Sequence, residues 1–99
     1  MSILMIRSKV KVTHVTEVEA GIKRLFAALQ QAQPEGIRYA SCRLADGETY
    51  VALLEIDEGI DNPLPTLPEF QAFQEVLKAS MVEPPTAEQL TVSGSYRLF

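Results

Sequence analysis

The chain has 99 residues, of which 46% are hydrophobic and 22% are charged, proportions that are typical of a globular domain and exclude a disordered or fibrous chain. We expect one domain, residues 1–99, because half of this length would bury too little apolar surface to fold alone. Thirteen acidic and nine basic residues give a net charge of −4, the wrong sign for holding nucleic acid or an anionic membrane.

The sequence has one cysteine, Cys42, and one histidine, His14. These two residues exclude an internal disulfide and the usual cysteine and histidine metal sites. The apolar run at the N-terminus is interrupted by Arg7, Lys9 and Lys11, well before it reaches the ~20 residues of a membrane span or the apolar core of a signal peptide. We therefore expect a cytoplasmic protein.

Residues 6–15 alternate between apolar and polar side chains, which predicts a first strand. Residues 16–19 have the spacing of a capping box, so we expect the Thr16 hydroxyl and the Glu19 carboxylate to begin a helix. Pro34 and Gly36 end this helix. Its apolar stripe is expected to consist of Val18, Ile22, Leu25, Phe26, Leu29 and Ala32.

Two β-rich runs, residues 37–45 and 48–56, flank Asp46 and Gly47, a dipeptide typical of a two-residue type I′ hairpin turn. If Ala45 lies opposite Glu48, alternation divides the cross-strand pairs between two faces, both substantially apolar. One face then pairs Tyr39 with Leu54, Ser41 with Ala52 and Arg43 with Tyr50, and the other pairs Arg38 with Glu55, Ala40 with Leu53 and Cys42 with Val51.

The rest of the chain predicts a loop, a helix and a strand. Residues 57–65 are rich in proline, glycine and acids, which indicates a solvated loop rather than a calcium site. Residues 66–69 repeat the capping-box spacing and predict a helix to Ser80. Residues 90–99 alternate and predict a last strand, with a bulge or bend at Gly94. The inward face of the second helix is expected to carry Phe70, Phe73, Val76 and Leu77.

The predicted order β-α-β-β-α-β is that of the ferredoxin-like α+β fold, in which both helices cover one face of a four-stranded antiparallel sheet. The other face of the sheet is then bare. Because the hairpin is apolar on both faces, we expect a second copy of the chain to cover that face in a homodimer.

Four segments resemble a known family: residues 34–40 (Pro-Glu-Gly-Ile-Arg-Tyr-Ala), the Asp46-Gly47 hairpin, residues 62–74 and residues 94–99. They resemble the antibiotic biosynthesis monooxygenase-like family of dimeric α+β barrel proteins. The resemblance implies an oxygenase that acts on a small aromatic or quinol compound without metal, flavin or other cofactor. The alternative is a non-catalytic dimeric module that binds a small molecule or serves in assembly.

The candidate site residues follow from the chemistry of such a reaction, which needs a weak base and hydroxyl donors in an apolar pocket. Histidine titrates nearest neutrality among the side chains, so His14 is the candidate catalytic base, the alternative being a capping histidine. Tyrosines could bind a substrate oxygen or merely pack at the rim. The candidate substrate-binding residues are Tyr39, Tyr50, Tyr96, Phe26, Phe70 and Phe73.

Two further groups have simpler readings. Arg7, Lys9 and Lys11 share one side of the first strand. We expect them to pair with Glu48 and Glu55, the alternative being a polar dimer cavity that accepts an anion. Cys42 could be a nucleophile, but its apolar neighbours favour a small buried side chain.

Overall fold

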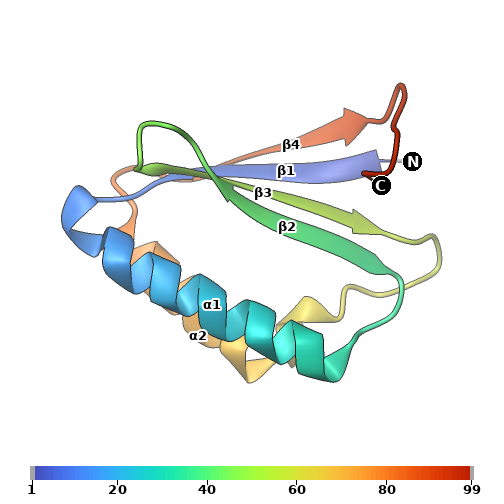
Figure 1. The fold of residues 1–99 in the computed structure, drawn as a ribbon, viewed down its shortest axis with the longest axis horizontal. Coiled ribbons are helices and arrows are strands. Elements are labelled where there is room, and N and C mark those ends of the chain that lie inside the picture. The colour runs from blue at the N-terminus through green and yellow to red at the C-terminus, as the bar shows by residue number, and fades with distance from the viewer. Residues whose placement is uncertain (1, 99) are drawn as a thin grey trace.

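The computed structural model describes residues 2–98, and it forms a four-stranded antiparallel sheet with two helices packed on one face (Figure 1). The strand order is β2-β3-β1-β4. This is the predicted ferredoxin-like α+β fold. The elements are β1 (Ser2–Lys9), α1 (Val15–Ala32), β2 (Ile37–Arg43), β3 (Thr49–Ile56), α2 (Pro68–Ser80) and β4 (Thr86–Thr91), with short 3-10 turns η1 (Val12–His14) and η2 (Leu64–Thr66).

The first strand lies earlier in the chain than residues 6–15, so that prediction is wrong at both ends. After Lys9 the Val10 amide still donates to the Glu48 carbonyl at 3.0 Å, and the chain then crosses to the helix layer. There the Lys11 amide donates to the Ser80 carbonyl at 2.8 Å, and Val10 forms an isolated bridge with Met81. These contacts with the end of α2 replace the strand ladder.

Neither predicted capping box forms. Helix α1 begins at Val15, one residue before Thr16, and has no side-chain cap. The carboxylate of Glu19 instead accepts a hydrogen bond from the Tyr50 hydroxyl, 2.7 Å away. Likewise Thr66 belongs to η2, and its hydroxyl donates to the Pro63 carbonyl at 2.6 Å. Glu19 and Thr66 thus each form a hydrogen bond with a group other than the helix N-terminus.

The hairpin register is confirmed, since all six predicted cross-strand pairs are present. The type I′ turn is wrong, because that turn requires a positive φ at both central residues, and of Asp46 and Gly47 only Gly47 has one, of 75°. The connection spans residues 45–48 and is closed by the Leu44 amide donating to the Thr49 carbonyl at 2.8 Å. The Asp46 carboxylate organises it by accepting bonds from the amides of Glu48 and Thr49 and from the Thr49 hydroxyl.

The last strand also differs from the prediction. Strand β4 is Thr86–Thr91, so only Leu90 and Thr91 of the predicted residues 90–99 belong to it. Thr91 pairs with Ser2, the first described residue of β1. Gly94 therefore lies after the strand rather than in a bulge, and Phe99 falls outside the described residues.

The core lies between the sheet and the helices, as expected for this architecture. Val18 and Leu25 of α1 are fully buried and meet Phe73 of α2. The helices approach closely at Gly21, where an added Cβ would stand 3.0 Å from the Phe73 ring. Both helix phases are confirmed apart from Ala32, which is exposed. The other predicted inward residues pack against the core, namely Ile22, Phe26, Leu29, Phe70, Val76 and Leu77.

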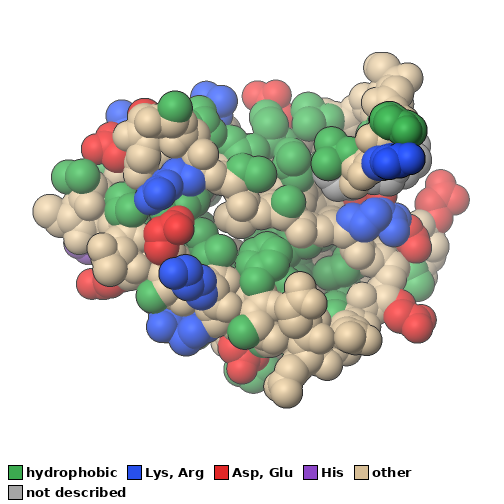
Figure 2. All heavy atoms as spheres, in the orientation of Figure 1, with side chains coloured by type: hydrophobic (Ala, Val, Ile, Leu, Met, Phe, Trp, Pro, Cys, Tyr) green, Lys and Arg blue, Asp and Glu red, His purple; other side chains and the backbone are tan. Residues whose placement is uncertain are grey.

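The structure settles which hairpin face meets the helices. Tyr39 and Tyr50 lie on the helix side, where they pack with the core residues of α1 and α2. In the edge-on view of Figure 2, hydrophobic side chains are visible between the two layers. Cys42 lies on the opposite, open face and is exposed, so the prediction that it is buried is wrong. Within residues 2–98, neither helix combines the length and the apolar character of a membrane span.

Candidate functional site: a cavity between α2 and the sheet

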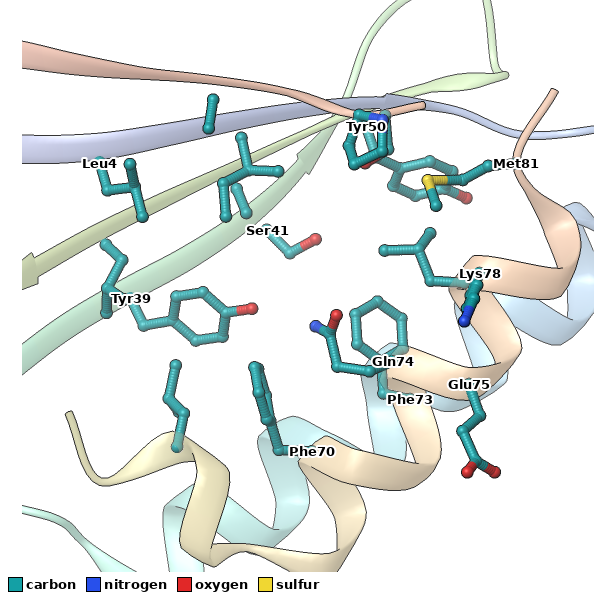
Figure 3. A pocket seen from close by; sticks show the side chains of 18 of the residues that line it. Leu4, Tyr39, Ser41, Tyr50, Phe70, Phe73, Gln74, Glu75, Lys78 and Met81 are labelled. Atoms are coloured by element: carbon teal, nitrogen blue, oxygen red, sulfur yellow. The ribbon is translucent and has the colours of Figure 1, made fainter. Parts of the chain in front are cut away.

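A cavity of about 610 Å³ lies between α2 and the helix-facing side of the sheet (Figure 3). We call it the α2 cavity. Alternation along β1 and β3 points Leu4, Ile6 and Leu54 into it from the sheet, while Phe70 and Phe73 enter from α2. Its volume lies within the roughly 300–1,000 Å³ of small-molecule sites, and its largely apolar wall suits an apolar ligand.

Three polar side chains point toward the middle of the α2 cavity, namely Tyr39 and Ser41 of β2 and Gln74 of α2 (Figure 3). The Tyr39 hydroxyl makes no hydrogen bond within the described part of the chain. Burial raises the pKa of Tyr39, so its hydroxyl keeps its proton at neutral pH. Tyr39 therefore offers a free hydrogen-bond donor to whatever occupies the cavity.

Tyr50 lines the same cavity in a different way. Its hydroxyl is already donated to Glu19 on α1, at 2.7 Å. Burial, together with this bond to a carboxylate, raises the pKa of Tyr50 to about 12. Tyr50 thus contributes the surface of its ring, and its proton is committed to Glu19.

The other candidate residues are divided between three places. His14 stands at the start of α1 and is absent from the cavity lining; its Nδ1 lies 3.2 Å from the Ser80 hydroxyl oxygen. That hydroxyl itself donates to the Val76 carbonyl, so it accepts from His14. Tyr96 is 81% exposed, with the Arg97 guanidinium carbon 5.0 Å from the centroid of its ring. The cavity therefore brings together only four of the seven candidates: Tyr39, Tyr50, Phe70 and Phe73.

Phe26 is not part of the α2 cavity. Its ring stacks on the far side of Tyr39, with the centroids 5.3 Å apart and the planes 7° from parallel. It lines a separate hollow of about 260 Å³ with Leu29, Pro34 and Tyr39. Phe26 therefore packs against the cavity residue Tyr39 and does not itself line the α2 cavity.

Ser41, Gln74 and Asn62 are among the lining residues that the sequence reasoning did not name as candidates. Ser41 is two residues from Tyr39 in β2 and so shares its face, and Gln74 is four residues from Phe70 in α2 and so lies on the same side of the helix. These spacings could have revealed both. Asn62 also lines the cavity, and its side-chain oxygen accepts from the Leu64 amide at 3.0 Å, which orders the loop before η2.

A cluster of charged residues lies at the open face of the sheet, one residue along β2 and β3 from the cavity residues Tyr39 and Leu54. Arg38 binds both Glu55 and Asp57, and these bonds raise the pKa of its guanidinium further. The Arg38 and Glu55 cross-strand pair is as predicted, whereas pairing of Glu55 with the bases of β1 is wrong. Within residues 2–98, no three His, Cys, Asp or Glu side chains are placed to hold a metal ion.

Comparison with known proteins defines the class of fold. No protein-family model and no curated protein matches the sequence. The fold, however, is shared with solved structures of antibiotic biosynthesis monooxygenase-like proteins. The chain is therefore similar in architecture to the family that its sequence segments resemble.

Three of these structures illustrate the similarity. A candidate antibiotic biosynthesis monooxygenase from Nitrosomonas europaea is 13% identical, with a TM-score of 0.77 over 95% of this chain and 100% of that one. Another, from Caulobacter crescentus, is 21% identical, with a TM-score of 0.70 over 94% and 90%. SnoaB, a cofactor-independent oxygenase from Streptomyces nogalater, is 19% identical, with a TM-score of 0.68 over 97% and 96%. At these identities the likeness establishes the fold.

Proposed function

We propose that this protein binds a small aromatic or quinol compound in the α2 cavity and oxygenates it without a cofactor. The observation that carries the proposal is the cavity itself, an apolar space of about 610 Å³ into which the Tyr39 hydroxyl projects with no partner of its own among residues 2–98. The description of SnoaB as a cofactor-independent oxygenase supports the choice of reaction.

Such a reaction balances without an added reductant. An electron-rich ring compound of the anthrone type loses a proton to a water molecule to give an anion, and O₂ accepts electrons from the anion. One oxygen atom becomes the new carbonyl oxygen and the other leaves as water with the two hydrogens of the oxidised methylene group. The protein has to favour the anion and keep bulk water from the reacting carbon.

The lining residues can perform both tasks. The Tyr39 hydroxyl can donate to the oxygen on which the negative charge of the substrate resides, which lowers the pKa of the bound substrate. Phe70 and Phe73 cover the ring faces and exclude water. The Ser41 hydroxyl and the Gln74 amide can hold a second oxygen substituent (Figure 3).

The test is oxygen consumption during aerobic incubation with anthrone-type and quinol compounds. We expect turnover by the wild-type protein and a loss of about tenfold or more in Tyr39→Phe, since this change removes one bond to a charged oxygen and leaves the ring in place. A Tyr96→Phe variant, which removes a hydroxyl from an exposed tyrosine outside the cavity lining, serves as the matched control and should keep wild-type turnover. Equal rates in Tyr39→Phe and wild type would exclude the proposed role of the hydroxyl.

A second candidate function is binding without turnover. It is favoured by the composition of the lining, in which the titratable residues are two tyrosines, Glu75 and Lys78, with no histidine. Glu75 and Lys78 are both exposed, at the outer side of α2. If the protein binds the ring compounds but consumes no oxygen with any of them, it is a binding module.

We also propose that the open face of the sheet is covered by a second copy of the chain. Met5, Ala40, Val51 and Leu53 share that face with exposed Cys42, and neither helix covers it (Figure 1). A dimer would hide this surface, with each subunit burying roughly the 800 Å² of a specific interface. Light scattering at micromolar concentration should give twice the mass of 11.0 kDa; a stable monomer would refute the dimer.

A further inference from the structure

Tyr39 lies between two hollows of the protein. One is the α2 cavity, of about 610 Å³, and the other is a more open surface hollow of about 260 Å³ beside the end of α1. Tyr39 belongs to the lining of both. The Tyr39 ring therefore lies between the two hollows, and the position of the ring sets the length of the α2 cavity.

Packing against Phe26 holds the Tyr39 ring in its position. The Tyr39 hydroxyl has no hydrogen bond to any described residue that would fix its direction. The ring instead lies flat against Phe26 of α1, with 5.3 Å between centroids and 7° between planes. An offset-stacked pair of this kind contributes more than its buried area alone. Without Phe26, the hollow on that side would have room for the tyrosine ring.

We infer that Phe26 is a positioning residue that holds the Tyr39 hydroxyl in the α2 cavity, and that this pair selects compact ligands carrying an acceptor oxygen. The inference rests on the proposed function only in taking the α2 cavity as the ligand site. Phe26 acts from the far side of Tyr39, through the ring that it stacks on. A ligand too long for the cavity would have to displace Tyr39 against this stack.

The first test needs no ligand. Nuclear Overhauser contacts of the Tyr39 ring protons are measured in the wild type, in Phe26→Ala and in Phe26→Tyr, which preserves the stacked ring. We expect wild type and Phe26→Tyr to show contacts to the α2 cavity lining. In Phe26→Ala we expect stronger contacts to Leu29 and Pro34, which line the smaller hollow with Tyr39, and weaker contacts to the lining of the α2 cavity. An unchanged contact pattern in a folded Phe26→Ala would overturn the inference, whether or not the protein is an oxygenase.

The second test compares binding of 4-nitrophenolate with that of 4-nitroanisole, its methyl ether, which has no charged oxygen. The wild type and Phe26→Tyr should prefer the phenolate by about tenfold or more, as expected for one hydrogen bond to a charged group. Tyr39→Phe should lose the preference, and Phe26→Ala should lose most of it although Tyr39 is still present. A full wild-type preference in Phe26→Ala would contradict the inference.

The two tests separate this inference from the proposed reaction. If the phenolate preference follows Phe26 while no variant consumes oxygen, the positioning role stands and the oxygenase proposal fails. If Phe26→Ala does not fold, Phe26→Leu, which keeps the site apolar, replaces it in both measurements. Phe26→Leu removes the flat stacking surface, so it should shift the ring contacts and the binding preference in the same direction, and wild-type values of both would again overturn the inference.

Discussion

Leu25 is the residue through which the packing of the helices on the sheet can be measured most directly. It is fully buried in α1 and belongs to the core with Val18 and Phe73. Leu25→Ala removes three carbon atoms from a site with no access to water, and the transfer of these atoms is worth roughly 2–3 kcal/mol. The residual cavity adds to this, so we expect a loss of about 3–4 kcal/mol in the free energy of unfolding.

The assay is urea unfolding followed by far-ultraviolet circular dichroism at one fixed protein concentration, since association would otherwise shift the apparent stability. Leu29→Ala is the matched control, because Leu29 lies one turn further along the same stripe but is only partly buried. It should cost about 1–2 kcal/mol. For a domain of this size, the larger loss corresponds to a fall of more than about 12 °C in Tm. Equal losses in the two variants, or a loss near zero for Leu25→Ala, would refute the burial argument.

Three further predictions concern the cavity and the titrating groups. Gly21→Ala should change the free energy of unfolding by less than about 1 kcal/mol, because the gain in helix propensity offsets the close contact with Phe73. The same variant should bind a ring compound more weakly in calorimetry, because the displaced Phe73 ring enters the α2 cavity. Asp46 accepts three bonds in the hairpin turn, and these lower its pKa to about 2. Its contribution to stability is therefore present above the unfolded pKa of about 3.9 and is lost as the pH falls toward 2; urea unfolding between pH 5 and pH 2 should show a shallower loss in Asp46→Asn, and an identical slope would contradict this. Tyr50 should form tyrosinate only near pH 12 in ultraviolet titration, and the stability that it contributes as a neutral donor is lost as the pH rises from about 10 through 12; ionisation of Tyr50 near pH 10 in the folded protein would contradict the Glu19 bond.

The hairpin shows what the sequence is able to predict. Alternation along residues 37–56 is so regular that a one-residue shift would exchange the two faces, so the register could be derived without a structure. The turn itself could not, because the Asp46 side chain competes with the backbone for its hydrogen bonds. Competing partners are also found where the two capping-box patterns do not form caps: Glu19 accepts from the Tyr50 hydroxyl, and the Thr66 hydroxyl donates to the Pro63 carbonyl.

The candidate site was predictable only in part, because tertiary packing and the strand bounds decide which residues reach the cavity. Alternation places Tyr39 and Tyr50 on one face, but the choice between the helix side and the open side depends on tertiary packing. His14 was expected on a strand, beside the cavity; because β1 ends at Lys9, it stands at the start of α1. Tyr96 was expected in a strand that ends before it, at Thr91. Because both strands end several residues earlier than predicted, His14 and Tyr96 lie outside the cavity lining.

The central claim is that an aromatic ligand occupies the α2 cavity, and filling the cavity tests it most directly. Ala52 of β3 lines the cavity, while Ala79 of α2 is exposed and lies outside its lining. Binding of an anthraquinone-type compound is measured by calorimetry for the wild type, Ala52→Phe and Ala79→Phe, each shown to be folded by circular dichroism. We predict that Ala79→Phe binds like the wild type and that Ala52→Phe binds at least tenfold more weakly, because the new ring occupies the ligand's space. Wild-type affinity in a folded Ala52→Phe would contradict the claim.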